Sequence, residues 1–303
     1  MQVEAAALAA DGRRDLSFVH DGLDGVHVER PGQREAAEPG TDNRDAGVYI
    51  IPLLFDTLYQ MKTPYETVDV KLVWERPEPR PRRIPAPLSR DAIVAAAVRL
   101  ADSEGLESVS IRKVAAALDA GPMRLYGYLA TKDELLELMV EAAYAEIEGE
   151  DLAAHDRREM LRSVARATRR VALKHEWLVD LLGGRPHLGP HAVAVLETSA
   201  TALAQASGLG AADDLWLALG TFNAYVVGAV RREIAERRAT RSTGVDEPGW
   251  QAAAGPYLRR MFATGRFPTL ARLIRDGAQA DPKDAFEEGL TYILDGIAAR
   301  HKR

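Results

Sequence analysis

The first regular pattern of apolar and polar positions begins after Ser89 and ends at Gly105. Its apolar residues recur at three- and four-residue intervals and are Ile93, Ala96, Ala97, Leu100 and Ala101. This spacing is that of one face of a helix, and serine and glycine are favourable residues at the start and the end of helices. The pattern therefore predicts an amphipathic helix between the two residues.

Two shorter helices are predicted next, joined by a turn of about three residues. The first starts after Ser110 and ends near Asp119. Its apolar face consists of Ile111, Val114, Ala115 and Leu118. The second starts at Pro122, a favoured residue of the first helical turn, and directs Leu125 and Leu129 inward.

A fourth helix is predicted at residues 131–147. Thr131 and Glu134 have the spacing of a capping box, in which the hydroxyl and the carboxylate each accept a backbone N–H of the first turn. The apolar face of this helix contains Leu135, Leu138, Met139, Ala142 and Ala143.

From about Arg157 the pattern is helical throughout. Breaks containing glycine or proline lie at residues 183–184, 208–210, 240–249, 265–268 and 277–282. They divide this part into six predicted helices. The longest is expected from Asp213 to about Arg238 and the last from Asp284 to about His301. Because alanine dominates the apolar residues and β-branched runs are scarce after residue 85, we expect an all-α fold.

Residues 1–85 do not continue this pattern, because glycine, proline and charged residues interrupt them, and a poorly ordered extension is expected there. Residues 47–74 are enriched in Tyr, Ile, Phe, Lys and Thr. That composition suggests upstream DNA translated from a start assigned too early, with the true start near Met61 or Val70. A disordered extension fits the same residues, and a small β-hairpin at residues 48–73 is a third interpretation.

Residues 76–87 (RPEPRPRRIPAP) are rich in proline and arginine. Proline fixes φ and lacks an N–H group, so these residues are expected to form an extended arm. Its cations Arg80, Arg82 and Arg83 either remain in solvent or enter a minor groove of DNA.

The net charge of −6 is unevenly distributed along the chain. Residues 76–132 contain ten basic and six acidic residues, so this stretch carries an excess of four positive charges and the rest of the chain carries −10. A local basic segment suits a polyanionic partner even where the net charge is negative.

Several classes of chemistry are disfavoured. The absence of cysteine excludes disulfides, thiolate metal sites and cysteine nucleophiles. No apolar stretch approaches the ~18 residues of a membrane span and no secretory signal pattern is present, so we expect a cytoplasmic protein without a membrane partner. An all-α enzyme acting on a small apolar substrate is the weaker alternative, because no phosphate-binding loop or nucleophile elbow accompanies Asp213 and Asp214.

Basic and aromatic residues surround the turn at residues 119–121. They are Arg112, Lys113, Arg124, Tyr126, Tyr128 and Lys132. Arginine can bond base edges or phosphate bidentately, and tyrosine, lysine and helix N-termini bind phosphate. Two short helices, a tight turn and this outer chemistry predict a helix-turn-helix at residues 110–129 that binds double-stranded DNA.

The segment IRKVAAALDAGPMRLYGYLATKDELLELM resembles the DNA-binding domain of the TetR family, and the resemblance extends over about residues 89–146. It implies that Tyr126 and Lys132 grip phosphates and that Arg112 and Arg124 read bases. The remaining expected DNA-binding residues are Ser110, Lys113, Gly121, Pro122, Met123 and Tyr128.

Three residues depart from that family's pattern. Asp119 stands where glycine is usual, Gly127 lies inside the recognition helix, and Tyr128 replaces a common histidine. Aspartate tolerates the left-handed conformation, so the first departure is mild. Gly127 costs about 1 kcal/mol of helix propensity, which suggests a helix that is completed on DNA.

Residues 156–303 resemble the ligand-binding domain of tetracycline-repressor-like proteins, notably in HEWLVDLL, RPHLGPHAVAVLE and GRFPTL. The resemblance implies a homodimer joined through two long C-terminal helices. Apolar stripes at the required spacing, which could also be plain core, are Phe222, Val226, Ala229 and Val230, and Phe286, Leu290, Ile293, Leu294 and Ile297.

The resemblance also implies an effector pocket inside this domain. Candidates to line it, by aromatic or polar character within apolar helices, are Trp177, His187, His191, Trp216, Asn223, Tyr225, Trp250, Tyr257 and Phe262. A metal site at His187 and His191 is not expected, because the sequence offers no third ligand beside them. No cofactor is expected.

The sequence thus predicts three parts: an extension at residues 1–85, a DNA-binding domain at residues 86–148, and an all-α ligand-binding and dimerisation domain at residues 149–303. We expect a homodimeric repressor that a small apolar or amphipathic effector releases from a palindromic operator. An activator or a ligand-independent regulator on the same fold is the alternative.

Overall fold

The computed structural model of the chain describes residues 72–79, 88–150, 156–184, 186–207, 211–277 and 281–300, except for the side chains of residues 206 and 207. Within these ranges the regular structure is entirely helical, so the predicted all-α fold is confirmed for the described part of the chain. The extension before residue 72, with its alternative start sites, and Arg80, Arg82 and Arg83 lie outside the described residues.

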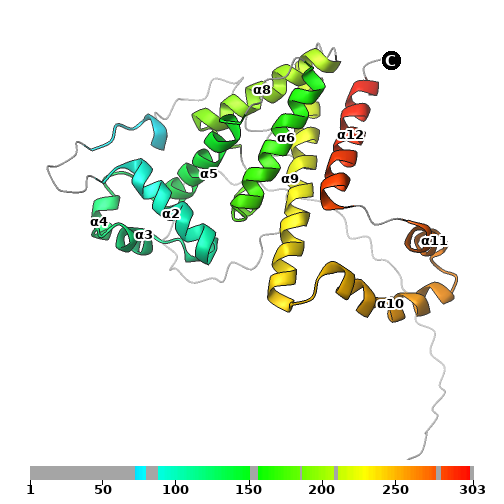
Figure 1. The fold of residues 1–303 in the computed structure, drawn as a ribbon. Coiled ribbons are helices and arrows are strands. Elements are labelled where there is room, and N and C mark those ends of the chain that lie inside the picture. Colours follow the sequence, from blue (N-terminus) through cyan, green and yellow to red (C-terminus); the bar gives the residue numbers. More distant parts are fainter. Residues whose placement is uncertain are drawn as a thin grey trace, which may run out of the picture. The chain divides into compact units, whose positions relative to one another are not determined.

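The helices of the predicted DNA-binding unit are α2 (Arg90–Glu104), α3 (Ile111–Ala117) and α4 (Pro122–Leu125), with a 3-10 turn η2 (Leu106–Ser108) between the first two (Figure 1). The predicted start and end of α2 are confirmed. The Ser89 hydroxyl accepts the Ala92 N–H at 3.1 Å, and Gly105 ends the helix with a φ of 85°.

Helix α5 (Lys132–Glu148) continues the chain from this unit and packs against α2 on one side and the C-terminal helices α6 and α8 on the other. Its predicted capping box is half realised. The Thr131 hydroxyl accepts the Glu134 N–H at 3.1 Å, but the Glu134 carboxylate accepts the N–H of Ala130 at 2.6 Å instead of that of the cap residue. Leu135 and Met139 are fully buried and join α5 to the core.

The C-terminal part contains α6 (Arg157–Lys174), α7 (Leu178–Leu181), α8 (Pro190–Ser207), α9 (Ala212–Thr243), α10 (Glu247–Ala263), α11 (Pro268–Asp276) and α12 (Pro282–Arg300). The described residues thus form seven helices here, and the prediction of six is wrong. The additional break lies at His175, whose ψ of 73° ends α6. No glycine or proline marks this break, which is why the pattern of turn residues missed it.

Helices α9 and α12 lie side by side (Figure 1) and bury most of the predicted dimer stripes between themselves and the core. Six residues of the stripes are at most 5% exposed in the single chain: Phe222, Val226, Val230, Phe286, Leu290 and Leu294. Their prediction as a dimer interface is therefore corrected, because they leave no surface for a partner. Ile293 and Ile297 remain half-buried, and Ala229 packs at the edge of the core.

Helices α10 and α11 connect α9 to α12 and differ from every other long helix, because they contain no buried residue and pack extensively against no other helix. They nevertheless expose large apolar side chains, with Trp250 64% exposed. In the described part of the chain, no helix has the length and apolar content required to span a bilayer.

Candidate DNA-binding surface

The helix pair α3 and α4 is built around a tight turn that the sequence anticipated. The Ser110 hydroxyl caps α3 by accepting the Lys113 N–H at 3.2 Å. In the turn, Asp119 takes a φ of 49°, and Ala120 donates its N–H to the Ala115 carbonyl at 2.9 Å. The expectation that aspartate adopts the left-handed conformation here is confirmed, and Pro122 then starts α4.

Helix α4 is one turn long, shorter than expected. It ends at Leu125, and residues 126–129 continue as consecutive turns held by the N–H groups of Gly127, Tyr128 and Leu129. Leu125 and Leu129 are both buried, as predicted, so the segment is anchored from its inner side.

The outer side of this pair carries the expected DNA-binding residues. Met123 is 80% exposed and Tyr126 is 48% exposed. The other exposed members of the set are Arg112, Lys113, Gly121, Pro122, Arg124 and Lys132. Within the described ranges, the side chains of Arg112, Arg124, Tyr126 and Lys132 have no hydrogen bond or ion pair to another described residue. Four side chains suited to base edges and phosphates are thus free to bind.

Three of the expected DNA-binding residues already have partners inside the chain. Ser110 is occupied as the cap of α3, Lys113 pairs with Glu104 at 2.8 Å, and the Tyr128 hydroxyl donates to the Leu88 carbonyl at 2.6 Å. Tyr128 is also half-buried, so its phenol supports the turn. The exposed Lys113 pair remains able to exchange for a phosphate, because such pairs contribute about 0–1 kcal/mol.

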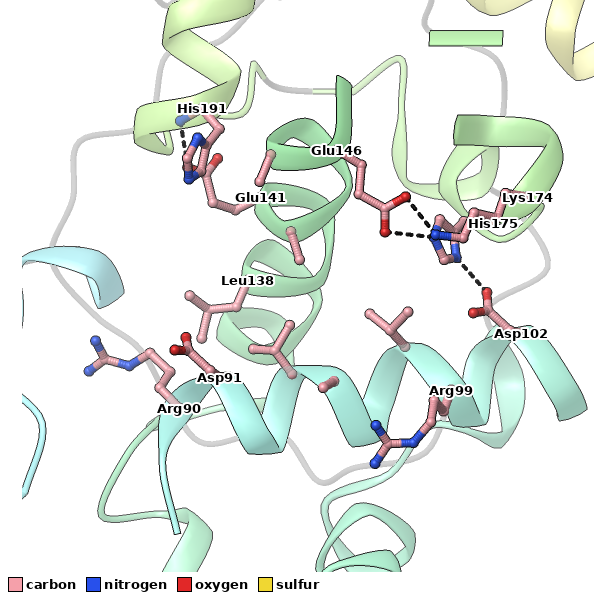
Figure 2. A pocket seen from close by; sticks show the side chains of 15 residues that line it. Arg90, Asp91, Arg99, Asp102, Leu138, Glu141, Glu146, Lys174, His175 and His191 are labelled. Atoms are coloured by element: carbon pink, nitrogen blue, oxygen red, sulfur yellow. Dashed lines mark hydrogen bonds and ion pairs between the residues drawn. The ribbon is translucent and has the colours of Figure 1, made fainter. Parts of the chain in front are cut away.

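A junction of polar side chains connects the DNA-binding unit to the C-terminal helices (Figure 2). Asp102 at the end of α2 lies 2.8 Å from Nδ1 of His175 and accepts the indole N–H of Trp177 at 2.7 Å. On the other side of the ring, Nε2 of His175 lies 3.2 Å from Glu146 of α5. Although burial opposes the shift, hydrogen bonds from Lys174 and His175 hold the pKa of Glu146 below its usual value.

Little in the sequence indicated this junction, because Asp102 and Glu146 occupy polar positions of amphipathic helices, where a solvated carboxylate is the ordinary expectation. Trp177 was predicted only as a pocket residue, although an indole N–H usually finds a partner when it is buried.

A cavity of about 620 Å³ adjoins the junction (Figure 2). Its apolar lining includes Val94 and Val98 on α2 and Leu138 on α5. Asp102, Glu146 and His175 of the junction belong to its polar lining. His191 is the one predicted pocket residue in this lining. The backbone N–H of His191 donates to the Glu141 carboxylate at 2.6 Å, and this hydrogen bond joins α5 to the start of α8.

The other predicted pocket residues do not converge on this cavity in the single chain. Trp177 lines a second cavity of about 760 Å³ on the far side of the junction, and the Tyr225 hydroxyl donates to the Phe286 carbonyl at 2.7 Å. Trp216 and Asn223 are half-buried on α9. Three more lie on α10: Trp250, Tyr257 and Phe262.

His187 lies under α5, where its ring centroid is 6.3 Å from that of Tyr144 and its Nε2 is 3.2 Å from the Leu181 carbonyl. Burial lowers the pKa of His187 and raises the pKa of Tyr144 to about 12. His191 instead pairs with Glu148 at 2.5 Å. Among the residues that the structure describes, no group of three or more potential ligands could hold a metal ion.

A helix pair with a tight turn, an exposed basic outer face and a helical body behind it define a helix-turn-helix DNA-binding regulator. Comparison with known proteins agrees. The model of bacterial regulatory proteins of the tetR family matches residues 93–139, and the model of the tetracyclin repressor-like C-terminal domain matches residues 151–301.

Among characterised relatives, the HTH-type transcriptional repressor DrrR1 of Streptomyces coeruleorubidus is 38% identical over 231 residues, which cover 75% of this chain and 84% of DrrR1. The class A tetracycline repressor protein of Escherichia coli is 32% identical over 70% of this chain and 92% of its own length. Among solved structures, that of apo ActR from Streptomyces coelicolor is similar to this chain with a TM-score of 0.60 and 27% identity. The match covers 71% of this chain and 96% of that one.

The chain belongs to the TetR family and is a DNA-binding transcriptional regulator.

Proposed function

We propose that the protein is a cytoplasmic repressor that binds a palindromic operator as a homodimer and is released by a small-molecule effector. The observation that carries DNA binding is a set of four exposed side chains around the α3–α4 turn that have no partner among the described residues. Effector release is supported by the relatives, since ActR has been solved in complex with actinorhodin and with (S)-DNPA. The role is that of a regulator and not of an enzyme.

We place the dimer interface on the outer face of α9 and α12. Leu217 and Tyr292 are exposed there beside the half-buried Ile293 and Ile297, and together they border a shallow groove of about 220 Å³. Gly296 leaves the centre of this face without a side chain, which allows a partner helix to approach closely. Two copies joined face to face by a two-fold axis present two recognition units to one duplex, which matches a palindrome.

The α10–α11 segment supports the same assembly. A chain segment with exposed Trp250, Tyr257 and Leu273 and no buried residue has an apolar surface that a partner subunit can cover. We propose that it packs on the partner and brings Trp250, Tyr257 and Phe262 to the partner's effector pocket. These three predicted pocket residues would then serve the second subunit instead of their own.

The effector signal would reach DNA through α5. This helix carries Lys132 at its start and Glu146 near its end, so a rigid tilt moves the phosphate contact and the junction together. An effector that binds one arrangement of the junction more tightly shifts the population toward it, and the spacing of the two recognition units changes accordingly.

A gel-shift titration with the DNA directly upstream of the gene, with and without candidate small molecules, tests the proposal. Saturable binding that weakens when a ligand is added supports it. Binding that no ligand changes contradicts effector release and leaves DNA binding intact, whereas an absence of sequence-selective binding to any duplex contradicts the proposal as a whole.

A further inference from the structure

Residues 72–79 precede the part of the chain that matches the DNA-binding domain of the family, yet they pack against it. Val73 lies in the 3-10 turn η1 (Val73–Glu75) and is 1% exposed within the core. The Glu75 carboxylate accepts the Leu72 N–H at 2.9 Å and closes this turn. The segment is therefore anchored by a buried side chain, unlike a solvated linker.

Two contacts join this segment to the turns that follow α4. The Arg90 guanidinium donates to the Arg76 carbonyl at 3.0 Å and lies 3.4 Å from the Tyr128 carbonyl, so it connects the two segments. The Arg76 side chain forms an ion pair with Glu134, and the same carboxylate oxygen accepts the Ala130 N–H.

Gly127 lies where the two segments pass each other. A Cβ atom at this position would lie 3.3 Å from the Arg124 carbonyl oxygen and 3.7 Å from Cγ of Pro79, so the proline ring is at ordinary contact distance. The glycine that departs from the family's pattern thus stands where residues 72–79 pass the recognition segment.

The DNA-binding segment depends on such support. Helix α4 is a single turn, and helices this short are not stable without tertiary contacts. Leu125 and Leu129 hold it only from the inside. Tyr126 and Lys132, the expected phosphate contacts, lie on either side of the residues that Arg90 and Glu134 hold.

Building on the proposed DNA-binding function, we infer that residues 72–79 are a brace that fixes the DNA-binding turn, and that Arg76 is a positioning residue for the phosphate contacts of Tyr126 and Lys132. The brace contacts no DNA itself. It compensates for the short recognition helix by fixing residues 126–132 before DNA is bound, which lowers the ordering cost of binding.

The test uses the full chain and a fluorescent duplex that the full chain selects from a randomised pool. In Arg76→Gln the ion pair is lost while Val73 stays buried, and operator affinity is expected to fall about five- to tenfold with little change in melting temperature. Arg76→Lys should recover most of the affinity, because Arg76 pairs with Glu134 through Nη2 and its Nε has no hydrogen-bond partner among the described residues.

The variant Glu134→Gln distinguishes the inferred brace from a second explanation, in which Arg76 contacts DNA directly. If the brace acts as inferred, this variant also weakens binding, and the double variant with Arg76→Gln is no weaker than the single variants. If Arg76 binds phosphate instead, removal of the Glu134 charge strengthens binding and the two effects add, which overturns the brace.

Val73→Asp provides a second, larger perturbation because a buried charge detaches the anchor. Leu72→Asp is the matched control, since Leu72 is exposed. Amide hydrogen exchange at residues 126–131 should accelerate in Val73→Asp and not in Leu72→Asp. Equal exchange and equal affinity in all variants overturn the brace alone, whereas a full chain that selects no duplex overturns the proposed function with it.

Discussion

Arg124 and Lys132 are both exposed cations of the DNA-binding surface, but they are expected to act differently. Arg124→Ala should lose about 1–3 kcal/mol on the preferred operator and less on operators altered at the base that it reads, so base preference relaxes. Lys132→Ala should weaken binding to all sequences and reduce the slope of log K against log salt by about one. Anisotropy titrations over operator variants and salt concentrations measure both effects.

Lys283→Ala is the matched control for Lys132, because Lys283 is an exposed lysine in the first turn of α12, away from the DNA-binding surface. It should leave the affinity and its salt dependence unchanged. Equal losses on every operator variant for Arg124→Ala would show that this arginine contacts phosphate and not bases.

Trp177 illustrates how a single hydrogen bond can link two parts of the chain. Trp177→Phe keeps an aromatic ring in the buried position but removes the N–H that Asp102 accepts at 2.7 Å. We expect a loss of about 1–2 kcal/mol in the free energy of unfolding, measured by urea denaturation. Leu181→Ala, which alters packing nearby without touching Asp102, helps to separate the hydrogen bond from general loosening of α7.

In Trp177→Phe, the response to an effector is also expected to weaken, because the junction transmits less of the tilt of α5 to α2. Unchanged stability together with an unchanged ligand response would show that the indole N–H contributes neither to folding nor to coupling.

At the scale of helices, local chemistry in the sequence was sufficient to predict most starts and ends. Ser89, Ser110 and Thr131 cap the helices that they were expected to cap, and Asp119 adopts the left-handed turn. These features depend on neighbouring residues alone. The break at His175 was missed because it depends on distant partners, Asp102 and Glu146.

Six residues of the predicted dimer stripes are buried within the single chain, and the sequence could not show this for a different reason. An apolar period of 3.6 marks a face that is covered, but it does not tell whether the cover is the same chain or a partner. Phe222 and Leu290 turned out to be covered within the chain. The brace at residues 72–79 was also missed. Residues 1–85 were expected to be a poorly ordered extension, and only residues 76–79, with two prolines and one arginine, belong to the predicted arm. The structure instead buries Val73 in the core.

The contact between α6 and α12 predicts a pH dependence of stability. Glu287 accepts from Arg166 at 2.7 and 2.9 Å, and this guanidinium holds the pKa of Glu287 below its usual value of 4.5. A carboxyl with a lowered pKa in the folded state stabilises it above the unfolded value, and this contribution is lost as the pH falls through the folded value. Glu287→Gln should therefore melt at a lower temperature than the parent chain at neutral pH.

The difference between Glu287→Gln and the parent chain should narrow as the pH falls below 4.5, because the parent carboxylate then becomes protonated. Thermal unfolding over a pH series measures it. Glu288→Gln alters the neighbouring exposed glutamate and should show no such convergence. A constant difference at all pH values would mean that packing, and not charge, accounts for the loss.

At the scale of the whole molecule, the proposed dimer interface on the outer face of α9 and α12 can be tested by one substitution. Leu217→Asp places a charge on the proposed interface, where it would lie unpaired against apolar partner residues. Because Leu217 is 44% exposed in one chain, the substitution should leave the fold of the subunit intact. Sedimentation velocity should then show a monomer, and circular dichroism should show an unchanged helical content.

Operator binding supplies the second measurement for Leu217→Asp. One recognition unit covers only half of a palindrome, so a monomer should bind the operator far more weakly and should bind full and half sites alike. Val193→Asp is the matched control, since Val193 on α8 is also 44% exposed but lies away from α9 and α12. A Leu217→Asp chain that stays dimeric would move the interface to another surface, and the exposed apolar residues of α10 and α11 would then be the next to substitute.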